Sequence, residues 1–87
     1  MSHTCHAVAC RTPCPPAYLM CSRDWFRVPR GLQRLVYHHF RIGQCDDKSP
    51  SLEWCRAADA AVAYVAALDG LPYARTFLKA FYPDEVA

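Results

Sequence analysis

Residues 5–29 read CHAVACRTPCPPAYLMCSRDWFRVP and contain four of the six cysteines of this 87-residue chain. Prolines stand at positions 13, 15 and 16 between these cysteines, and proline neither continues a helix nor donates to a strand ladder. Something other than regular secondary structure must therefore fix the shape of the segment. A zinc ion suits it, because zinc takes four ligands tetrahedrally and tolerates irregular backbone between them. We expect a structural zinc knuckle, with Cys5, Cys10, Cys14 and Cys21 as its ligands.

Other roles for these cysteines stay open. No apolar secretory leader precedes Cys5, so a reducing cytoplasm is the expected compartment, and this favours metal over a disulfide framework. A catalytic cysteine needs an oxyanion loop and a histidine–carboxylate pair, and neither pattern is recognisable. His6 is a competing ligand, although a histidine beside a cysteine ligand usually points away from the same ion.

The motif extends beyond the cysteines. Cys5-x4-Cys10 is followed by Pro15-Pro16, by Cys21-x2-Asp24-Trp25-Phe26-x-Val28-Pro29, by Leu32 and an aromatic residue at the helix end, and by Arg41 and Gly43-Gln44. From about residue 5 to residue 68 the chain resembles a group of small uncharacterised proteins of bacteriophages and prophages. The resemblance implies a phage origin and a Cys-Cys-Cys-His zinc site, and it implies no activity.

The chain departs from this group at the fourth ligand. The position that is usually histidine in the group is Asp24 here, and Cys14 is an additional cysteine. The fourth ligand is therefore either the Cys14 thiolate or a carboxylate oxygen of Asp24. Thiolate is the softer ligand and the commoner one in closed structural sites, so the sequence favours Cys14.

Three helices are predicted after the knuckle, over residues 29–40, 49–70 and 72–81. Proline at a first-turn position, the Ser49-Pro50 pair and Gly70 supply their start and stop signals. A single helical turn over 22–26 would place Cys21 and Asp24 on one side and direct Trp25 and Phe26 inward. We expect one all-α domain over residues 1–87, with the zinc knuckle at 5–29 and a helical part at 30–82.

Apolar spacing predicts which faces of these helices are buried. The first helix has a stripe of Leu32, Leu35, Val36, His39 and Phe40. The last has Tyr73, Phe77 and Phe81 on one face, which is expected to be a lid on the core, with an exposed surface for a partner or a second copy as the alternative. The alanine-rich helix between them is the predicted core helix, with two buried seams. Cys55 fits one seam, while a second metal site with Cys45, His38 and His39 stays open.

Charge is distributed unevenly along the chain. The net charge is +2, yet six arginines precede Gln44 against one acidic residue, Asp24. The predicted partner-binding face consists of Arg27, Arg30, Arg34, His38 and Arg41. Guanidinium groups match phosphate and carboxylate, so this row suits nucleic acid or an acidic protein surface.

The resemblance implies a phage-encoded protein of the bacterial cytoplasm, and together with the sequence patterns it favours a non-enzymatic interaction protein with one structural Zn²⁺ as its cofactor. The expected partner is a host protein or nucleoprotein complex, such as a nucleic-acid-targeting defence system that the protein inhibits. The alternative is a small nucleic-acid-binding regulator, disfavoured because the basic row offers no evident aromatic platform for bases. A membrane span is not expected, because the longest uncharged stretch of the C-terminal half, 60–68, is far shorter than about 20 residues.

Overall fold

The computed structural model describes residues 4–15, 18–40 and 50–86. Its elements are α1 (Ser22–Trp25), α2 (Arg30–His39), α4 (Leu52–Leu68), α5 (Thr76–Phe81) and a short 3-10 turn, η1 (Pro83–Val86). Strands are absent from the described ranges, where pairing is limited to an isolated bridge between Thr4 and Pro13. The all-α prediction is confirmed, and none of the described helices is long and apolar enough to cross a membrane.

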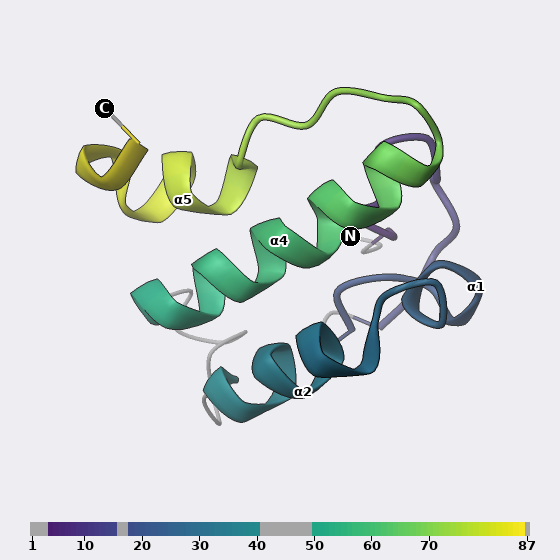
Figure 1. Ribbon diagram of the computed structural model, residues 1–87, viewed down its shortest axis with the longest axis horizontal. Coiled ribbons are helices and arrows are strands. Elements are labelled where there is room, and N and C mark those ends of the chain that lie inside the picture. Colours follow the sequence, from purple (N-terminus) through teal and green to yellow (C-terminus); the bar gives the residue numbers. More distant parts are fainter. Residues whose placement is uncertain (1–3, 16–17, 41–49, 87) are drawn as a thin grey trace.

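Helix α4 is the centre of the molecule, with α2 packed on one side of it and α5 on another (Figure 1). It begins at Ser51, whose side-chain oxygen accepts a hydrogen bond of 3.1 Å from the Trp54 N–H. The cap is thus two residues later than the predicted Ser49, which lies outside the described residues. Serine at either position has the same capping chemistry, so sequence alone could not choose between them.

The end of α4 confirms the predicted stop at Gly70. This glycine has a φ of 69°, in the left-handed region that favours glycine. Its N–H donates to the Ala67 carbonyl at 3.1 Å, and the Leu71 N–H donates to the Ala66 carbonyl at 2.9 Å. These are the two hydrogen bonds of a Schellman motif, which satisfies carbonyls that the helix leaves unpaired.

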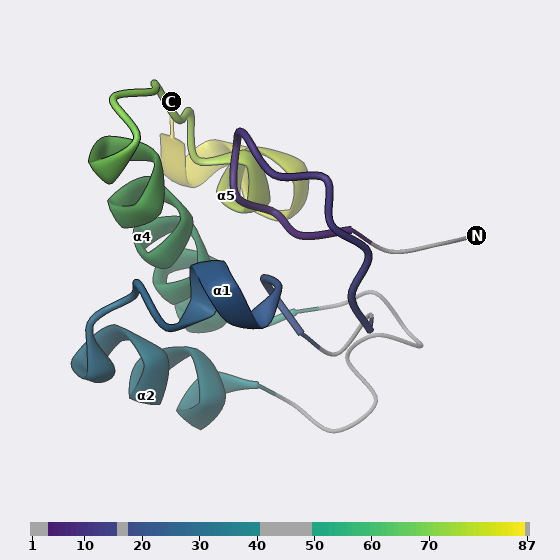
Figure 2. The same ribbon diagram turned by 90° about the vertical axis from the view of Figure 1, so that its right-hand side faces the viewer.

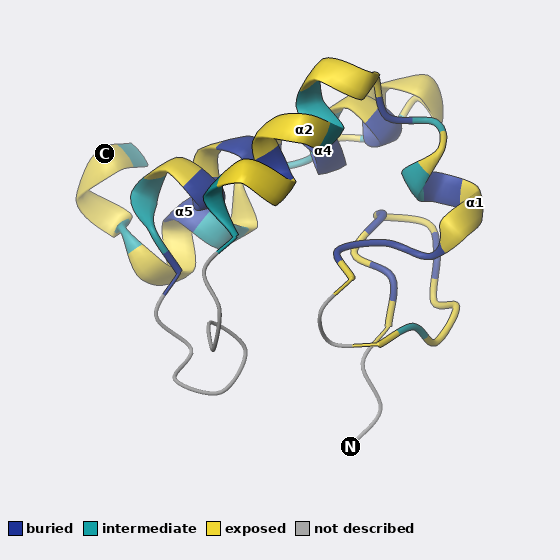
Figure 3. Ribbon diagram, turned by 90° about the horizontal axis from the view of Figure 1, so that it is seen from below, coloured by how far each residue is buried: buried dark blue, intermediate teal, exposed yellow. Residues whose placement is uncertain are grey.

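The core is built on the small residues of α4. Cys55, Ala58, Ala61, Val62 and Val65 are all 0% exposed. Alanine allows neighbouring elements to approach closely, which explains how a helix in so small a protein is covered on several sides (Figure 3). Cys55 is therefore a small core residue, as predicted from its place in the apolar seam of this helix.

Helix α2 packs on α4 along a narrower stripe than predicted. Val36 is buried, and Leu32 and Phe40 are partly buried against the core. Leu35 is 47% exposed, because it lies at the flank of the contact with α4. Helix α2 ends at His39, and Phe40 continues in an extended conformation.

Helix α5 begins four residues later than predicted, at Thr76 rather than Pro72. The cause is Asp59 of α4, which is 3% exposed and holds the segment in place. Its carboxylate accepts hydrogen bonds from the Tyr73 hydroxyl at 2.6 Å and from the backbone N–H groups of Phe77 at 3.0 Å and Leu78 at 2.9 Å. Tyr73 is thereby fixed outside the helix, in the segment before it.

The predicted aromatic face of the last helix is therefore wrong. Phe77 is half-buried and packs edge-to-face on Trp54, with ring centroids 5.1 Å apart. Phe81 is 41% exposed and does not contribute to a lid. The aromatic cover on this side of the core comes from Phe77 and Tyr73, on two different segments.

Candidate metal centre

The N-terminal segment folds back on itself and presents two cysteines. The Cys5 N–H donates to the Thr12 carbonyl at 2.9 Å, and the Cys10 N–H donates to the Ala7 carbonyl at 3.0 Å. The first bond closes a loop, and the second makes a tight turn within it. Backbone hydrogen bonding therefore brings Cys5 and Cys10 close together without a helix or a strand (Figure 2).

The single turn α1 presents the other two candidate ligands. Cys21 immediately precedes it, and the Trp25 N–H donates to the Cys21 carbonyl at 2.9 Å. Cys21 and Asp24 consequently lie on the same side, as predicted from their spacing of three. Trp25 is half-buried against the core, but Phe26 is 79% exposed, so its predicted inward packing is wrong. The helical turn ends at Trp25, one residue earlier than predicted, and Phe26 is its C-cap residue.

Cys5, Cys10, Cys21 and Asp24 form one cluster, close enough to hold a metal ion. Their sulfur atoms and carboxylate oxygen all lie within 4.8 Å of one another. The side chains are almost completely enclosed: Asp24 is 1% exposed, Cys5 5%, Cys21 8% and Cys10 9%. Four buried groups of this kind, drawn from a loop and a helical turn, are a complete ligand set for one ion.

The spacing of the cluster can be compared with a tetrahedron. Around zinc, with Zn–S near 2.3 Å and Zn–O near 2.0–2.2 Å, two sulfurs lie about 3.8 Å apart and a sulfur and an oxygen about 3.5 Å apart. In the structure the Cys10 and Cys21 sulfurs are 3.8 Å apart. Oδ2 of Asp24 is 3.3 Å from the Cys5 sulfur and 3.4 Å from the Cys21 sulfur. These edges have the lengths that a tetrahedral site requires.

The two oxygens of Asp24 face different groups. Oδ2 faces the thiols, whereas Oδ1 accepts a hydrogen bond of 3.1 Å from Nη1 of Arg27. Burial by itself raises the pKa of the Asp24 carboxyl, but hydrogen bonds from the surrounding thiols and from Arg27 outweigh it and hold the pKa below its ordinary value. Asp24 is thus ionised and oriented as a ligand must be.

For one thiol of the cluster burial is the dominant influence, and the net pKa shift is upward. Burial raises the pKa of Cys5 to about 12, whereas a hydrogen bond with Thr12 lowers the pKa of Cys10. Cys5 therefore carries its proton at neutral pH until a metal ion displaces it. Metal binding at such a site releases protons and weakens as the solution is acidified.

Two arginines balance the charge of the cluster. Arg27 reaches past Asp24 to Asp69, just after α4, with Nη2 2.6 Å from Oδ1 of that carboxylate. Nη2 of Arg23 lies 3.8 Å from the Cys10 sulfur. Three thiolates and one carboxylate around a divalent ion would leave two negative charges, and these two guanidinium groups would offset part of them, because Arg27 also pairs with Asp69. The arginines border a polar depression that gives solvent its approach to Cys10 and Asp24.

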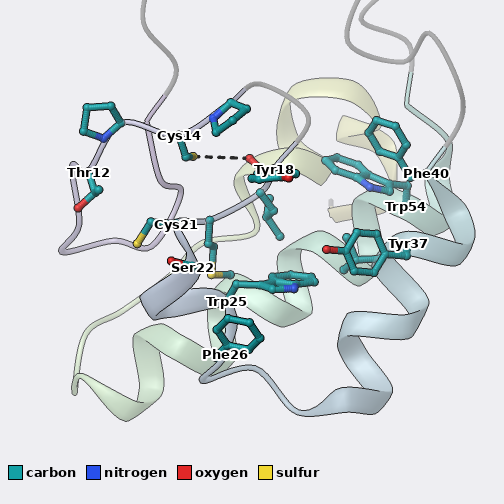
Figure 4. Close-up of a pocket in the computed structure, with 15 residues that line it drawn as sticks. Thr12, Cys14, Tyr18, Cys21, Ser22, Trp25, Phe26, Tyr37, Phe40 and Trp54 are labelled. Carbon is teal, nitrogen blue, oxygen red and sulfur yellow. Dashed lines mark hydrogen bonds between the residues drawn. The ribbon is translucent and has the colours of Figure 1, made fainter.

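Cys14, which the sequence favoured as the fourth ligand, is not a member of the cluster. Its sulfur lies 3.8 Å from the Tyr18 carbonyl oxygen, the contact drawn as a dashed line in Figure 4. The alternative ligand, Asp24, occupies the fourth position. His6 is also outside the cluster, since its ring packs against Phe77 at 4.9 Å.

Two alternatives from the sequence can be compared with this geometry. The Cys10 and Cys21 sulfurs are 3.8 Å apart, far from the roughly 2.05 Å of a disulfide, and the thiols of Cys5, Cys10, Cys21 and Cys55 are not oxidised. A second metal site would need Cys55, which is 0% exposed in the core, together with Cys45, which lies outside the described residues.

The predicted partner-binding face is partly formed. Arg30, Arg34 and His38 are exposed along α2, and Arg41 lies outside the described residues. Arg27 is occupied by Asp24 and Asp69, so it supports the metal centre instead. Sequence reasoning missed this role, although the spacing of three between Asp24 and Arg27 was the available signal.

In comparisons with known proteins, no family model, no curated protein and no solved structure matches the chain.

Proposed function

We propose that this chain is a zinc-stabilised, non-enzymatic interaction protein, with Cys5, Cys10, Cys21 and Asp24 as the ligands of one structural zinc ion. The observation that carries the proposal is that three buried sulfurs and one carboxylate oxygen lie within 4.8 Å of one another, with three of their separations, 3.3, 3.4 and 3.8 Å, close to tetrahedral edge lengths. Thiolate-rich ligand sets select zinc over magnesium, calcium and manganese, which prefer oxygen.

The ligand count supports a structural role over a catalytic one. Catalytic zinc sites keep a coordination position for water or substrate, usually beside three protein ligands. Here four protein groups converge, and each is at most 9% exposed. Such a site fixes the fold of the loop that carries it and leaves no position at which a water molecule would be activated.

The size of the protein explains why a metal would be useful. A chain of 87 residues buries a limited fraction of its surface, and its net stability is small. Residues 4–15 contain no helix, and their described pairing is a few backbone hydrogen bonds. Coordination energy becomes folding energy in such a segment, because the ligands are not pre-assembled in the unfolded chain.

The partner that we propose is a protein or nucleoprotein complex of a bacterial host. The resemblance of residues 5–68 to small phage and prophage proteins points to a host machine, and inhibition of a nucleic-acid-targeting defence system is the form of activity that we favour. Protein binding also suits the surface, which presents several exposed aromatic side chains, among them Tyr18 at 56%, Phe26 at 79% and Tyr37 at 61%.

Direct binding to nucleic acid is a second candidate, favoured by one face of α2. Arg30 and Arg34 are exposed, and within the described part of the chain neither makes an ion pair. Tyr37, three residues after Arg34, shares their face and supplies an exposed aromatic surface. Binding of a labelled single-stranded oligonucleotide that weakens with salt and with Arg30→Gln and Arg34→Gln would support this candidate.

Metal analysis tests the main proposal. Protein purified without added metal should contain about one zinc per chain, and a strong chelator should abolish the cooperative thermal transition until zinc is restored. Cobalt substitution should give the intense visible absorption of tetrahedral thiolate coordination. Protein that is metal-free yet fully helical and cooperatively folded, or that has its cluster cysteines oxidised, would contradict the proposal.

A further inference from the structure

An aromatic groove of about 600 Å³ lies between the knuckle and α2. Six aromatic side chains line it: Tyr18, Trp25, Phe26, Tyr37, Phe40 and Trp54. They come from the loop before α1, from α1 and its end, from α2 and from the start of α4, and their rings surround one space (Figure 4). Segments far apart in sequence therefore combine to make a single concave surface of ligand-binding size.

The chemistry of the lining limits what the groove can bind. None of the residues that line it is an acid, an arginine, a lysine or a histidine. A phosphate group or a charged side chain would lose water there without gaining a partner. The occupant that matches the groove is neutral and largely apolar. Three of the aromatic side chains are more than half exposed, and an apolar patch of this kind marks an interaction site.

A polar atom at the back of the groove indicates one further property of the occupant. Trp54 is 8% exposed, and among the described residues its indole N–H has no hydrogen-bond acceptor. A buried donor without a partner is unfavourable, and such groups are rare in folded proteins. Trp54 lies beside the rings of Tyr37 and Phe40 in the close-up (Figure 4). The indole N–H is itself buried, so an incoming carbonyl oxygen can accept from it only after a neighbouring ring has turned aside.

We propose that this groove binds a proline-rich peptide segment in the polyproline II conformation, an inference that rests on the proposed function as an interaction protein. A helical peptide uses its carbonyls internally and has none to offer the indole. Strand addition needs an exposed sheet edge, and the described ranges contain no strand. A polyproline II segment is neutral, docks on aromatic surfaces and leaves its backbone carbonyls unbonded.

The groove and the metal centre share a wall. Cys21 belongs to the cluster and also lines the groove, and Ser22 and Trp25 follow it in α1. Coordination of Cys21 thereby fixes the position of the wall on which the peptide lies. Peptide binding should accordingly require metal.

The test uses the full-length, zinc-loaded protein and a fluorescein-labelled decaproline peptide, measured by fluorescence anisotropy. A labelled decapeptide of alternating glycine and serine is the matched control, because it is neutral and lacks the rigid polyproline II conformation. We expect saturable binding of decaproline and much weaker binding of the control peptide. Absence of saturable decaproline binding, or equal binding of both peptides, would overturn the inference.

Variants locate the binding to the groove. Phe26→Ala and Tyr37→Ala change exposed side chains, and each should weaken binding about tenfold, as truncation of aromatic contact residues often does. Trp54→Phe keeps the aromatic ring but removes the N–H, and should weaken binding about threefold to tenfold. Tyr64→Ala is the control, since Tyr64 is 41% exposed on α4 and does not line the groove. Weaker decaproline binding in Tyr64→Ala alone, or unchanged binding in all three groove variants, would refute the assignment of the peptide to the groove.

The outcomes separate this inference from the proposed function. Zinc content and the thermal transition are measured on every sample, so a folded, zinc-loaded protein that ignores decaproline refutes the groove assignment alone. A labelled ten-residue oligothymidylate is measured in parallel. If it binds and the Phe26→Ala and Tyr37→Ala variants abolish that binding, the groove takes nucleobases and the peptide proposal is wrong.

Discussion

Replacing Asp24 by asparagine should damage metal binding far more than replacing Cys14 by serine. A structural zinc site contributes about 10–16 kcal/mol at neutral pH, so each of four ligands accounts for about 2.5–4 kcal/mol. Loss of the Asp24 carboxylate should therefore lower zinc affinity by about 10²- to 10³-fold. Cys14 is not a member of the cluster, and its replacement should change affinity by less than about threefold, as expected for a residue outside the site.

Competition with a chromophoric chelator of known affinity measures this difference. Wild type, Asp24→Asn and Cys14→Ser are titrated at the same pH and ionic strength, and a thermal melt of each variant records the accompanying loss of stability. Asp24→His is an informative third variant, because imidazole is a zinc ligand but cannot pair with Arg27 in place of the carboxylate. It should retain more affinity than Asp24→Asn if the carboxylate acts as a ligand. A large loss in Cys14→Ser together with a small loss in Asp24→Asn would refute the ligand set.

Three further predictions follow from particular contacts. Arg27→Gln removes the group that orients Asp24 and should lower zinc affinity about tenfold or more in the same competition assay; unchanged affinity would show that Arg27 does not support the ligand. Asp59→Ala leaves three donors unpaired and should lower the free energy of unfolding by about 3–5 kcal/mol in chemical denaturation, whereas Tyr73→Phe should lower it by about 1 kcal/mol. Equal losses in the two variants would show that Asp59 does not hold all three donors. Arg30→Gln combined with Arg34→Gln should change stability by less than about 0.5 kcal/mol per site, and a marked fall in melting temperature would show that their face is packed.

The features that the sequence predicted correctly are those that depend on neighbours along the chain. Gly70 ends α4 because a left-handed residue closes a hydrogen-bonded motif with the preceding turn. Cys21 and Asp24 share a side because they are three apart on a helical turn. The apolar and alanine-rich pattern of residues 52–68 identifies the core helix in the same way. Each of these features depends only on residues that are close together in the sequence.

The errors concern contacts between distant segments. Tyr73 is held outside α5 by Asp59, and an aspartate within an alanine-rich helix gives no sign that it will cap another helix. The preference for Cys14 over Asp24 as the fourth ligand followed ligand softness, whereas the structure brings Asp24 and not Cys14 into the cluster. Sequence spacing narrowed the fourth ligand to two residues, and only the three-dimensional arrangement distinguishes them.

The link between the knuckle and the helical part shows how a small site can influence the whole fold. Arg27 hydrogen-bonds to Asp24 at the metal centre and to Asp69 just after α4, two residues that are far apart in sequence. On the same side of the molecule, Leu19, Met20 and Val28 of the knuckle are buried in the shared core. Coordination that fixes Asp24 also fixes Arg27, and through it the docking of the knuckle on the end of α4. Loss of metal should thus loosen the apolar contacts of the knuckle together with its ligands, because the same short segment carries both.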